Sequence, residues 1–207
     1  VTTNNDVLFP DGADVDIATD MSGVVRAITL NPAENQFGSA LVTLKVSDGE
    51  FEIVIESLPT MKQNRFNDVV ADPLGRVFCG VMSTKSTKGW VYRMNTDKTF
   101  TKVINNTGTA NGMAFSKNEK KLFFCDSKKS SVSVFDYEKK TGEISNRKII
   151  LQTLRSESGS SDGLCIDSND NIWVGRWDGS SIVQIDQSGC ELQKIQFPTK
   201  KITTLCF

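Results

Sequence analysis

The chain has 207 residues, with 24 basic and 25 acidic side chains, a net charge of −1 and no histidine. This charge gives no electrostatic basis for nucleic-acid binding, and no apolar run reaches the ~18–20 residues of a membrane span. The absence of histidine excludes Ser-His-Asp and Cys-His catalysis and every histidine metal site. Any chemistry must therefore use carboxylates, amides, hydroxyls, Lys, Arg or Cys.

The cysteines and the start of the chain bear on the cell compartment. The five cysteines form no Cys-x-x-Cys pair and their number is odd, so no disulfide or zinc framework is expected. We expect them to be small apolar core residues. The first residues show neither the basic nor the apolar region of a secretory signal. We expect a cytoplasmic protein, with no membrane, nucleic-acid or protein partner implied.

Strand and turn signals run along the chain, because short stretches rich in Val, Ile, Phe and Tyr alternate with Gly, Asn, Asp, Ser and Lys. Residues 1–39 are irregular apart from one expected strand at 24–28. Residues 40–46 and 51–56 flank Asp48-Gly49, a hairpin signal, and are expected to be outer strands of a blade. No amphipathic helix of useful length is expected, and residues 158–161 are typical of a loop.

From residue 67 the expected strands fall into groups of four. The groups are 67–72, 76–81, 90–94 and 100–104; 111–116, 121–125, 131–135 and 147–151; and 162–167, 172–175, 181–185 and 191–197. A four-stranded unit that repeats every ~40–50 residues is typical of a propeller blade. The sequence therefore predicts an all-β protein, a β-propeller of four-stranded blades.

The same repeat predicts one partial propeller domain over residues 1–207, truncated at both ends. Its whole blades are expected at about 67–104, 111–151 and 162–197, with partial blades before and after. Residues 203–207 match 162–166, so they are expected to begin the first strand of another blade. Such a set of blades does not close a ring, and an open propeller leaves apolar faces and strand edges exposed. We therefore expect a fragment of a longer chain.

Three polar residues stand at one equivalent position, the start of the first strand in each whole blade: Asn67, Asn111 and Asp162. The first strand of a blade lines the central channel, so these side chains are expected to converge at one end of it. Oxygen-bearing side chains that meet there suit a hard cation such as Ca²⁺, Mg²⁺ or Mn²⁺. Asn-Gly and Asp-Gly are also common turn dipeptides, so the repeat alone leaves a turn role open for Asn111 and Asp162.

Several separated motifs occur in a fixed order: Asn64-Arg-Phe-Asn-Asp68, Asp72-Pro-Leu-Gly-Arg76, Asn111-Gly112, Asp126-Ser127, Phe135-Asp-Tyr137, Asp162-Gly-Leu-Cys-Ile-Asp167 and Thr203-Thr-Leu-Cys-Phe207. From about residue 50 to the last residue, this succession resembles the SMP-30/gluconolactonase/luciferin-regenerating-enzyme family, in particular its regucalcin-like branch. The resemblance implies a six-bladed propeller that hydrolyses sugar (aldono-) lactones such as gluconolactone. It also implies one divalent cation, Ca²⁺ first of all, with Zn²⁺, Mg²⁺ or Mn²⁺ as alternatives.

The resemblance also implies roles for individual residues. Asn111 and Asp162 match metal ligands, and Asp162 is the expected catalytic base. Arg65 and Asn67 match substrate-contacting positions, and Asp68 is a further candidate. Two features depart from the family. The Gly-Glu-x-Pro-type motif that supplies a further metal ligand near the chain start is absent, and Ser83-Thr-Lys85 follows the point where relatives often carry an acidic substrate-contacting residue.

Two further hypotheses remain beside lactone hydrolysis. The first is a Ca²⁺-binding, regucalcin-like regulatory protein with little or no catalysis, which would bind Ca²⁺ without turning over a lactone. The second is an interaction propeller of WD or kelch type, which would carry large exposed aromatic residues on one face. The 17 aromatic residues, 12 Phe, 3 Trp and 2 Tyr, are expected to serve mostly in blade packing.

Overall fold

The computed structural model describes residues 2–3, 15–19, 25–30, 42–43 and 64–207. By its contacts the chain divides into two compact units, 1–53 and 54–207. In the first unit, two short pairs of strands are antiparallel: β1 (Thr2–Thr3) with β4 (Val42–Thr43), and β2 (Val15–Thr19) with β3 (Val25–Leu30). The strand expected at 24–28 corresponds to β3, whereas the hairpin at Asp48-Gly49 and the strand at 51–56 lie outside the described residues.

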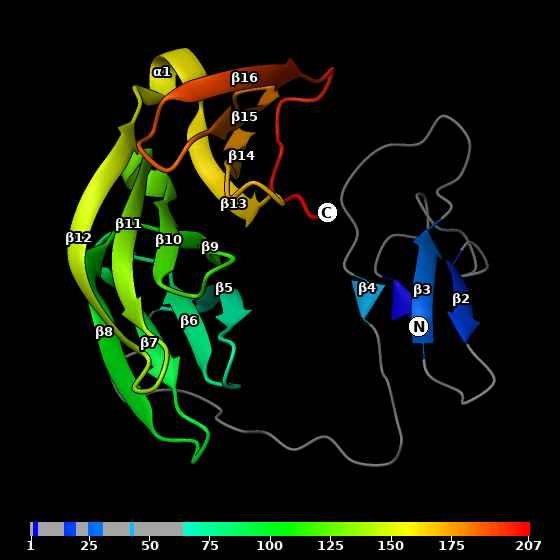
Figure 1. The fold of residues 1–207 in the computed structure, drawn as a ribbon. Helices are drawn as coiled ribbons and strands as arrows, with labels where there is room; N and C mark the ends of the chain where they lie inside the picture. Colours follow the sequence, from blue (N-terminus) through cyan, green and yellow to red (C-terminus); the bar gives the residue numbers. More distant parts are fainter. Residues whose placement is uncertain (1, 4–14, 20–24, 31–41, 44–63) are drawn as a thin grey trace. The chain divides into compact units, whose positions relative to one another are not determined.

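The second unit contains three four-stranded antiparallel sheets in which each strand pairs with its neighbours in sequence (Figure 1). Sheet I consists of β5 (Phe66–Ala71), β6 (Val77–Val81), β7 (Gly89–Met94) and β8 (Phe100–Thr107). Sheet II consists of β9 (Ala110–Phe115), β10 (Lys121–Asp126), β11 (Ser131–Glu138) and β12 (Glu143–Gln152). Sheet III consists of β13 (Ser160–Ile166), β14 (Ile172–Trp177), β15 (Ser181–Ile185) and β16 (Glu191–Gln196).

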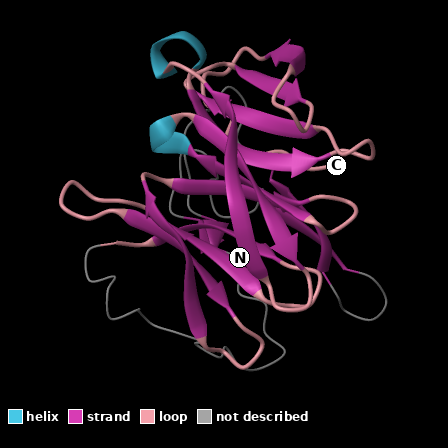
Figure 2. Cartoon of the chain, turned by 60° about the vertical axis from the view of Figure 1, so that its left-hand side comes forward, coloured by secondary structure: helices cyan, strands magenta, loops and turns pink. Residues whose placement is uncertain are grey.

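These sheets confirm the all-β class and the three groups of four strands that the sequence predicts. The first strands lie side by side, because β9 packs against β5 on one side and against β13 on the other. The number of blades in the whole protein, the extent of the domain and its truncation stay predictions. Helical structure in the described residues is limited to a 3-10 turn at Ser127–Lys129 and one turn of helix, α1 (Arg155–Ser158) (Figure 2). No helix described here is long and apolar enough to span a membrane.

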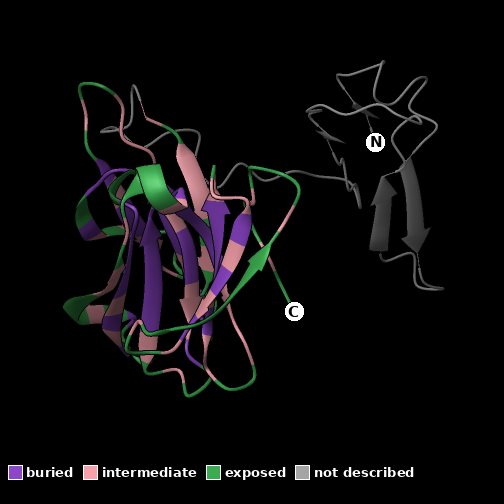
Figure 3. Ribbon diagram, turned by 90° about the horizontal axis from the view of Figure 1, so that it is seen from above, coloured by how far each residue is buried: buried purple, intermediate pink, exposed green. Residues whose placement is uncertain are grey.

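The core lies between the sheets and is built by alternation along the strands. Phe124 of β10 packs into the cluster shared with sheet I, whereas Phe123 and Cys125 pack into the cluster shared with sheet III. Successive strand residues point to opposite faces of a sheet. Sheet II packs against sheet I on one face and sheet III on the other, so it must be apolar on both faces. Figure 3 shows the buried residues along the inner strands, and the outermost strand β16 is exposed throughout.

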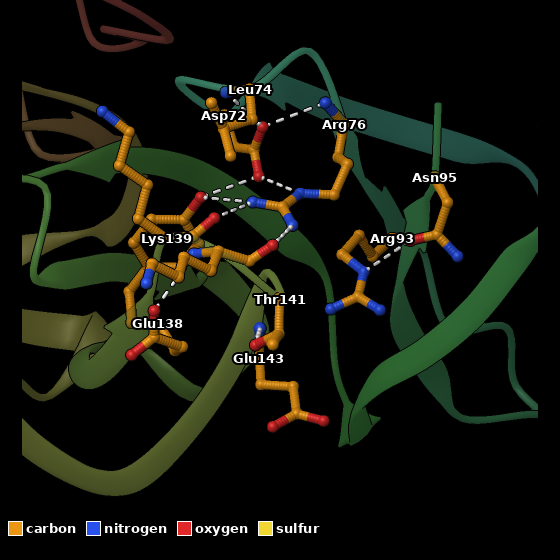
Figure 4. A network of polar contacts seen from close by, with 11 residues as sticks. Asp72, Leu74, Arg76, Arg93, Asn95, Glu138, Lys139, Thr141 and Glu143 are labelled. Carbon is orange, nitrogen blue, oxygen red and sulfur yellow. Dashed lines mark hydrogen bonds and ion pairs between the residues drawn. The ribbon is translucent and has the colours of Figure 1, made fainter. Parts of the chain in front are cut away.

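A polar contact joins sheet I to sheet II just beyond the C-terminal end of β5. The Asp72 carboxylate accepts hydrogen bonds from Arg76 Nε at 2.5 Å and from the Tyr137 hydroxyl at 2.7 Å, and Figure 4 shows Asp72 facing Arg76. Burial alone would raise the pKa of Asp72, but the bonds from Tyr137 and Arg76 outweigh it and lower that pKa. This contact stabilises the two sheets in one relative orientation.

Three expectations from the sequence are wrong in detail. Residues 203–207 form no strand, although Gly163 N donates to Thr203 O at 2.8 Å. The segment expected to be a loop at 158–161 is already strand β13 from Ser160 onward. Cys79 and Cys125 are buried as expected, but Cys190 and Cys206 are exposed. Cys190 lies between β15 and β16, and Cys206 lies beyond β16 near the last residue; no further sheet of the described chain covers either of them.

Candidate functional site

The strand register shows that the three polar positions are equivalent. In each sheet, the residue before the polar one pairs across to the residue that ends, or nearly ends, the second strand. The pairs are Phe66 with Val81, Ala110 with Asp126 and Ser161 with Arg176. The next residues are therefore Asn67, Asn111 and Asp162, at the same place in three adjacent first strands.

Asn111 and Asp162 stand in strands, so the turn alternative for them is wrong. Asn111-Gly112 lies inside β9 and Asp162-Gly163 inside β13. Close packing explains why glycine occupies both positions. A Cβ at Gly112 would lie 2.4 Å from the Leu164 backbone nitrogen, and one at Gly163 would lie 2.6 Å from Thr203 O. The absence of a side chain lets neighbouring segments approach closely, and this brings the polar residues before the glycines together.

These residues line one cavity of about 680 Å³. All five residues that the sequence singles out lie in its wall: Arg65, Asn67, Asp68, Asn111 and Asp162. They come from the loop before β5, from β5 itself, from β9 and from β13. Residues almost a hundred positions apart in the sequence therefore line one cavity, as the repeat predicts.

Asp162 is the buried acid of this cavity, with 7% of its surface exposed. The Asn111 side-chain amide donates to its carboxylate, and also to Ser127 Oγ at 3.0 Å. Burial, together with the nearby charge of Asp68, raises the pKa of Asp162 to about 6, against the lowering effect of the Asn111 bond. Burial also raises the pKa of Asp68. Across the described residues neither carboxylate has an ion-pair partner.

A buried carboxylate (Asp162) beside a partly buried one (Asp68), with no cationic partner among the described residues, is unfavourable by itself, and a bound cation would relieve it. Among the residues that line the cavity, Asn67, Asp68, Asn111 and Asp162 carry carboxylate or amide oxygens, which are the ligands hard divalent cations prefer. Among the residues that the structure describes, no group of three His, Cys, Asp or Glu side chains converges as a complete metal site. Asn111 and Asp162 therefore fit part of a cation's ligand set, with Asp68 as a nearby negative charge.

Arg65 and Asn67 form a second polar group in the same wall. Arg65 Nη1 donates to Asn67 Oδ1 at 3.3 Å and to Phe66 O at 3.0 Å, while Asn67 Nδ2 donates to Ala110 O at 3.0 Å. The last bond crosses from sheet I to sheet II, so it fixes the Asn67 amide relative to Asn111. Arg65 is exposed and retains further N–H groups for a ligand.

The sequence does not single out three further residues that line the cavity, one from each sheet. In each sheet, one residue of the second strand pairs with the start of the first strand, and the residue after it lines the cavity. These lining residues are Met82, Ser127 and Trp177. The register that identifies Asn67, Asn111 and Asp162 would have identified them too, had it been applied to the second strands. Lys128 and Arg155 also line the cavity, and nothing in their local sequence distinguishes them from solvated residues.

A family model described as "SMP-30/Gluconolactonase/LRE-like region" matches residues 5–207. The chain belongs to this family. Within the SMP-30/gluconolactonase/LRE-like proteins, it is 34% identical over 206 residues to regucalcin of Gallus gallus, which covers 90% of this chain and 69% of that protein. It is 38% identical over 143 residues to pentonolactonase XacC of Haloferax volcanii, over 69% of this chain and 49% of the relative. The chain thus spans about half the length of that relative.

Solved structures give the same family. A luciferin-regenerating enzyme matches with a TM-score of 0.68 and 26% identity, over 92% of this chain and 58% of that one. XC5397 of Xanthomonas campestris, described as a gluconolactonase, matches with a TM-score of 0.60 over 88% of this chain and 59% of that chain. Its identity of 20% supports a likeness of fold alone.

Proposed function

We propose that this protein hydrolyses sugar lactones, of the aldonolactone type, with the help of one divalent cation. The observation that carries the proposal is the contact between Asn111 and the buried carboxylate of Asp162, in a cavity that Arg65 and Asn67 also line. The family supports the choice of reaction, since a relative at 38% identity is named pentonolactonase. A cavity of about 680 Å³ is also of the size that small-molecule ligands occupy.

Asn111 and Asp162 would hold the cation, and Ca²⁺ is our first choice because the donors are oxygens and the similar proteins include regucalcins. A bound divalent cation supplies polarisation of the lactone carbonyl and a lowered pKa for a nearby water. Zn²⁺, Mg²⁺ and Mn²⁺ are the alternatives to test.

Asp162 would act as the base. Without a cation, burial and the charge of Asp68 raise the pKa of its carboxyl to about 6; a bound cation would lower this pKa and keep the carboxylate ionised, as a base must be. Its carboxylate would take a proton from the attacking water and return it to the ring oxygen as the lactone C–O bond breaks. Asn111 donates to the same carboxylate and so holds it in place.

Arg65 and Asn67 would bind the polyol and orient it. Their contacts with each other and with Ala110 O leave a fixed pair of polar side chains in the cavity wall. Hydrogen bonds from such a pair to sugar hydroxyls would hold the carbonyl in one pose, which raises the rate by removing orientational freedom.

The test is lactone hydrolysis followed by pH-stat, with and without added Ca²⁺ or Mn²⁺ and after chelation. Asp162→Asn keeps the size of the side chain but removes the base, so hydrolysis should fall about 1,000-fold with an unchanged circular dichroism spectrum. Asp97→Asn, in an exposed turn, is the matched control and should keep the rate. A full rate in Asp162→Asn contradicts the assignment. Calorimetric Ca²⁺ binding without any lactone turnover would instead favour the regulatory alternative.

A further inference from the structure

A second recess opens beside the candidate site. It has a volume of about 400 Å³ and is formed by Ser83–Lys88, by Asn106–Gly108 and by Lys128 and Lys129; we call it the basic recess. Ser83 and Lys128 line both the basic recess and the larger cavity. The two spaces therefore share a wall, and a ligand in one can extend toward the other.

The charge of the basic recess is entirely of one sign. Its lining includes four lysines, Lys85, Lys88, Lys128 and Lys129, and no acidic residue. Lys129 has a carboxylate partner, Asp126, at 3.4 Å. Within the described chain the other three lysines have none. Four lysines that line one recess give it a positive potential, and this potential attracts an anion.

Two of the four lysines, Lys128 and Lys129, are positioned by contacts with other residues of the recess. A Cβ at Gly108 would lie 2.4 Å from the Cβ of Lys128, so only glycine lets Lys128 lie against this loop. Lys128 Nζ is 3.2 Å from Ser83 Oγ, and Lys129 Nζ donates to Asn106 O at 2.6 Å. Ser83 N in turn donates to Gly108 O at 2.7 Å, which joins the two rims.

We propose that the basic recess binds the phosphoryl group of a phosphorylated sugar lactone, whose lactone ring occupies the neighbouring cavity. A phosphate monoester carries nearly two negative charges and three acceptor oxygens, which suits the three lysines that have no carboxylate partner in the described chain and the hydroxyl groups of the Ser83–Thr87 segment. Lysine serves as a point charge for phosphate in many sites. This inference rests on the proposed function, because it specifies the substrate class of the same site.

The test compares 6-phosphogluconate with gluconate, two hydrolysis products that differ only in the phosphate, by calorimetry in the presence of Ca²⁺. Binding of a product needs no turnover. We expect 6-phosphogluconate to bind about tenfold more tightly at low salt, and we expect this preference to shrink as salt is raised. The double variant Lys85→Gln/Lys88→Gln should lose most of the preference. Lys194→Gln, which removes one exposed charge from β16, is the charge control and should keep it.

Equal affinity for the two acids would overturn the inference, and so would an equal loss in Lys194→Gln. Inorganic phosphate distinguishes a free anion from a substrate group: it should displace 6-phosphogluconate and leave gluconate bound. If inorganic phosphate binds but the two sugar acids bind equally, the recess takes the free ion and the substrate assignment is wrong. The two proposals fail separately. Gluconolactone hydrolysis without a phosphate preference contradicts only this inference, whereas a phosphate preference without hydrolysis of any lactone contradicts the proposed reaction.

Discussion

Sheets II and III carry buried residues of opposite charge at the same place. Asp126 ends β10 and pairs with Ala110, the residue before Asn111; Arg176 lies at the equivalent point of β14 and pairs with Ser161, the residue before Asp162. Their exposed fractions are 0% and 1%. The equivalent residue of sheet I is the apolar Val81, so the fold itself does not require a charge there.

Each charge supports the backbone that leads to a candidate ligand, but with different partners. The Asp126 carboxylate accepts from the backbone N–H of Gly108 at 2.9 Å and of Thr109 at 3.1 Å, which precede β9. Arg176 Nη1 donates to Ser161 Oγ at 2.7 Å and to Thr153 Oγ1 at 3.2 Å. Arg176 Nε has no partner in the described structure. The comparison indicates that Asp126 stabilises the folded protein, whereas Arg176 contributes little to its stability.

The largest effect on stability is expected from Asp126→Ala. It leaves the Gly108 and Thr109 N–H groups without an acceptor in a buried place, and it removes the partner of Lys129. The free energy of unfolding should fall by about 3 kcal/mol, measured by urea denaturation. Asp126→Asn keeps one acceptor oxygen and should lose about half as much. A loss below about 1 kcal/mol for Asp126→Ala would show that these backbone groups find other partners.

The sequence predicts the part of the site that repeats. Asn67, Asn111 and Asp162 could be found because a polar residue recurs at the start of three apolar strands, and a one-residue error in register would have moved them to the other face. Asp126 and Arg176 could not be assigned in the same way. They have opposite charge at one position, and their burial depends on packing between sheets. The expectation that Cys190 and Cys206 are core residues is wrong for a similar reason, because an apolar residue is buried only where another sheet covers it.

The opposite ends of the first strands provide a second difference between sheets II and III. Ser116 Oγ accepts from Lys121 N at 3.0 Å, whereas the equivalent Asp167 accepts from Asn171 N at 2.9 Å and also from Trp173 Nε1 at 2.9 Å and Gln184 Nε2 at 2.8 Å. Burial alone would raise the pKa of Asp167, but the hydrogen bonds from Trp173 and Asn171 lower it well below its usual range.

Asp167→Ser makes sheet III resemble sheet II, and should lower the free energy of unfolding by about 2 kcal/mol at pH 7. Because the folded protein holds Asp167 ionised below its normal pKa, this contribution is complete above the unfolded value of about 3.9 and declines as the pH falls. The difference between the wild type and Asp167→Ser should therefore shrink as the pH falls from about 4 to about 2. Ser116→Ala has no titrating group and should show a difference that does not change with pH. A constant difference for Asp167→Ser would contradict the ionic role.

Arg176→Met is expected to have the smallest effect on stability, with a free energy of unfolding within about 1 kcal/mol of that of the wild type. The variant loses the bonds to Ser161 and Thr153, but it also removes a desolvated guanidinium with no carboxylate partner, and methionine fills a similar volume. Replacing a buried charge by an apolar residue of like size is often neutral for this reason. Arg176→Ala separates charge from volume, because it leaves a cavity and should cost more than the methionine variant. A loss in Arg176→Met as large as that in Asp126→Ala would mean that Arg176 is as well paired as Asp126.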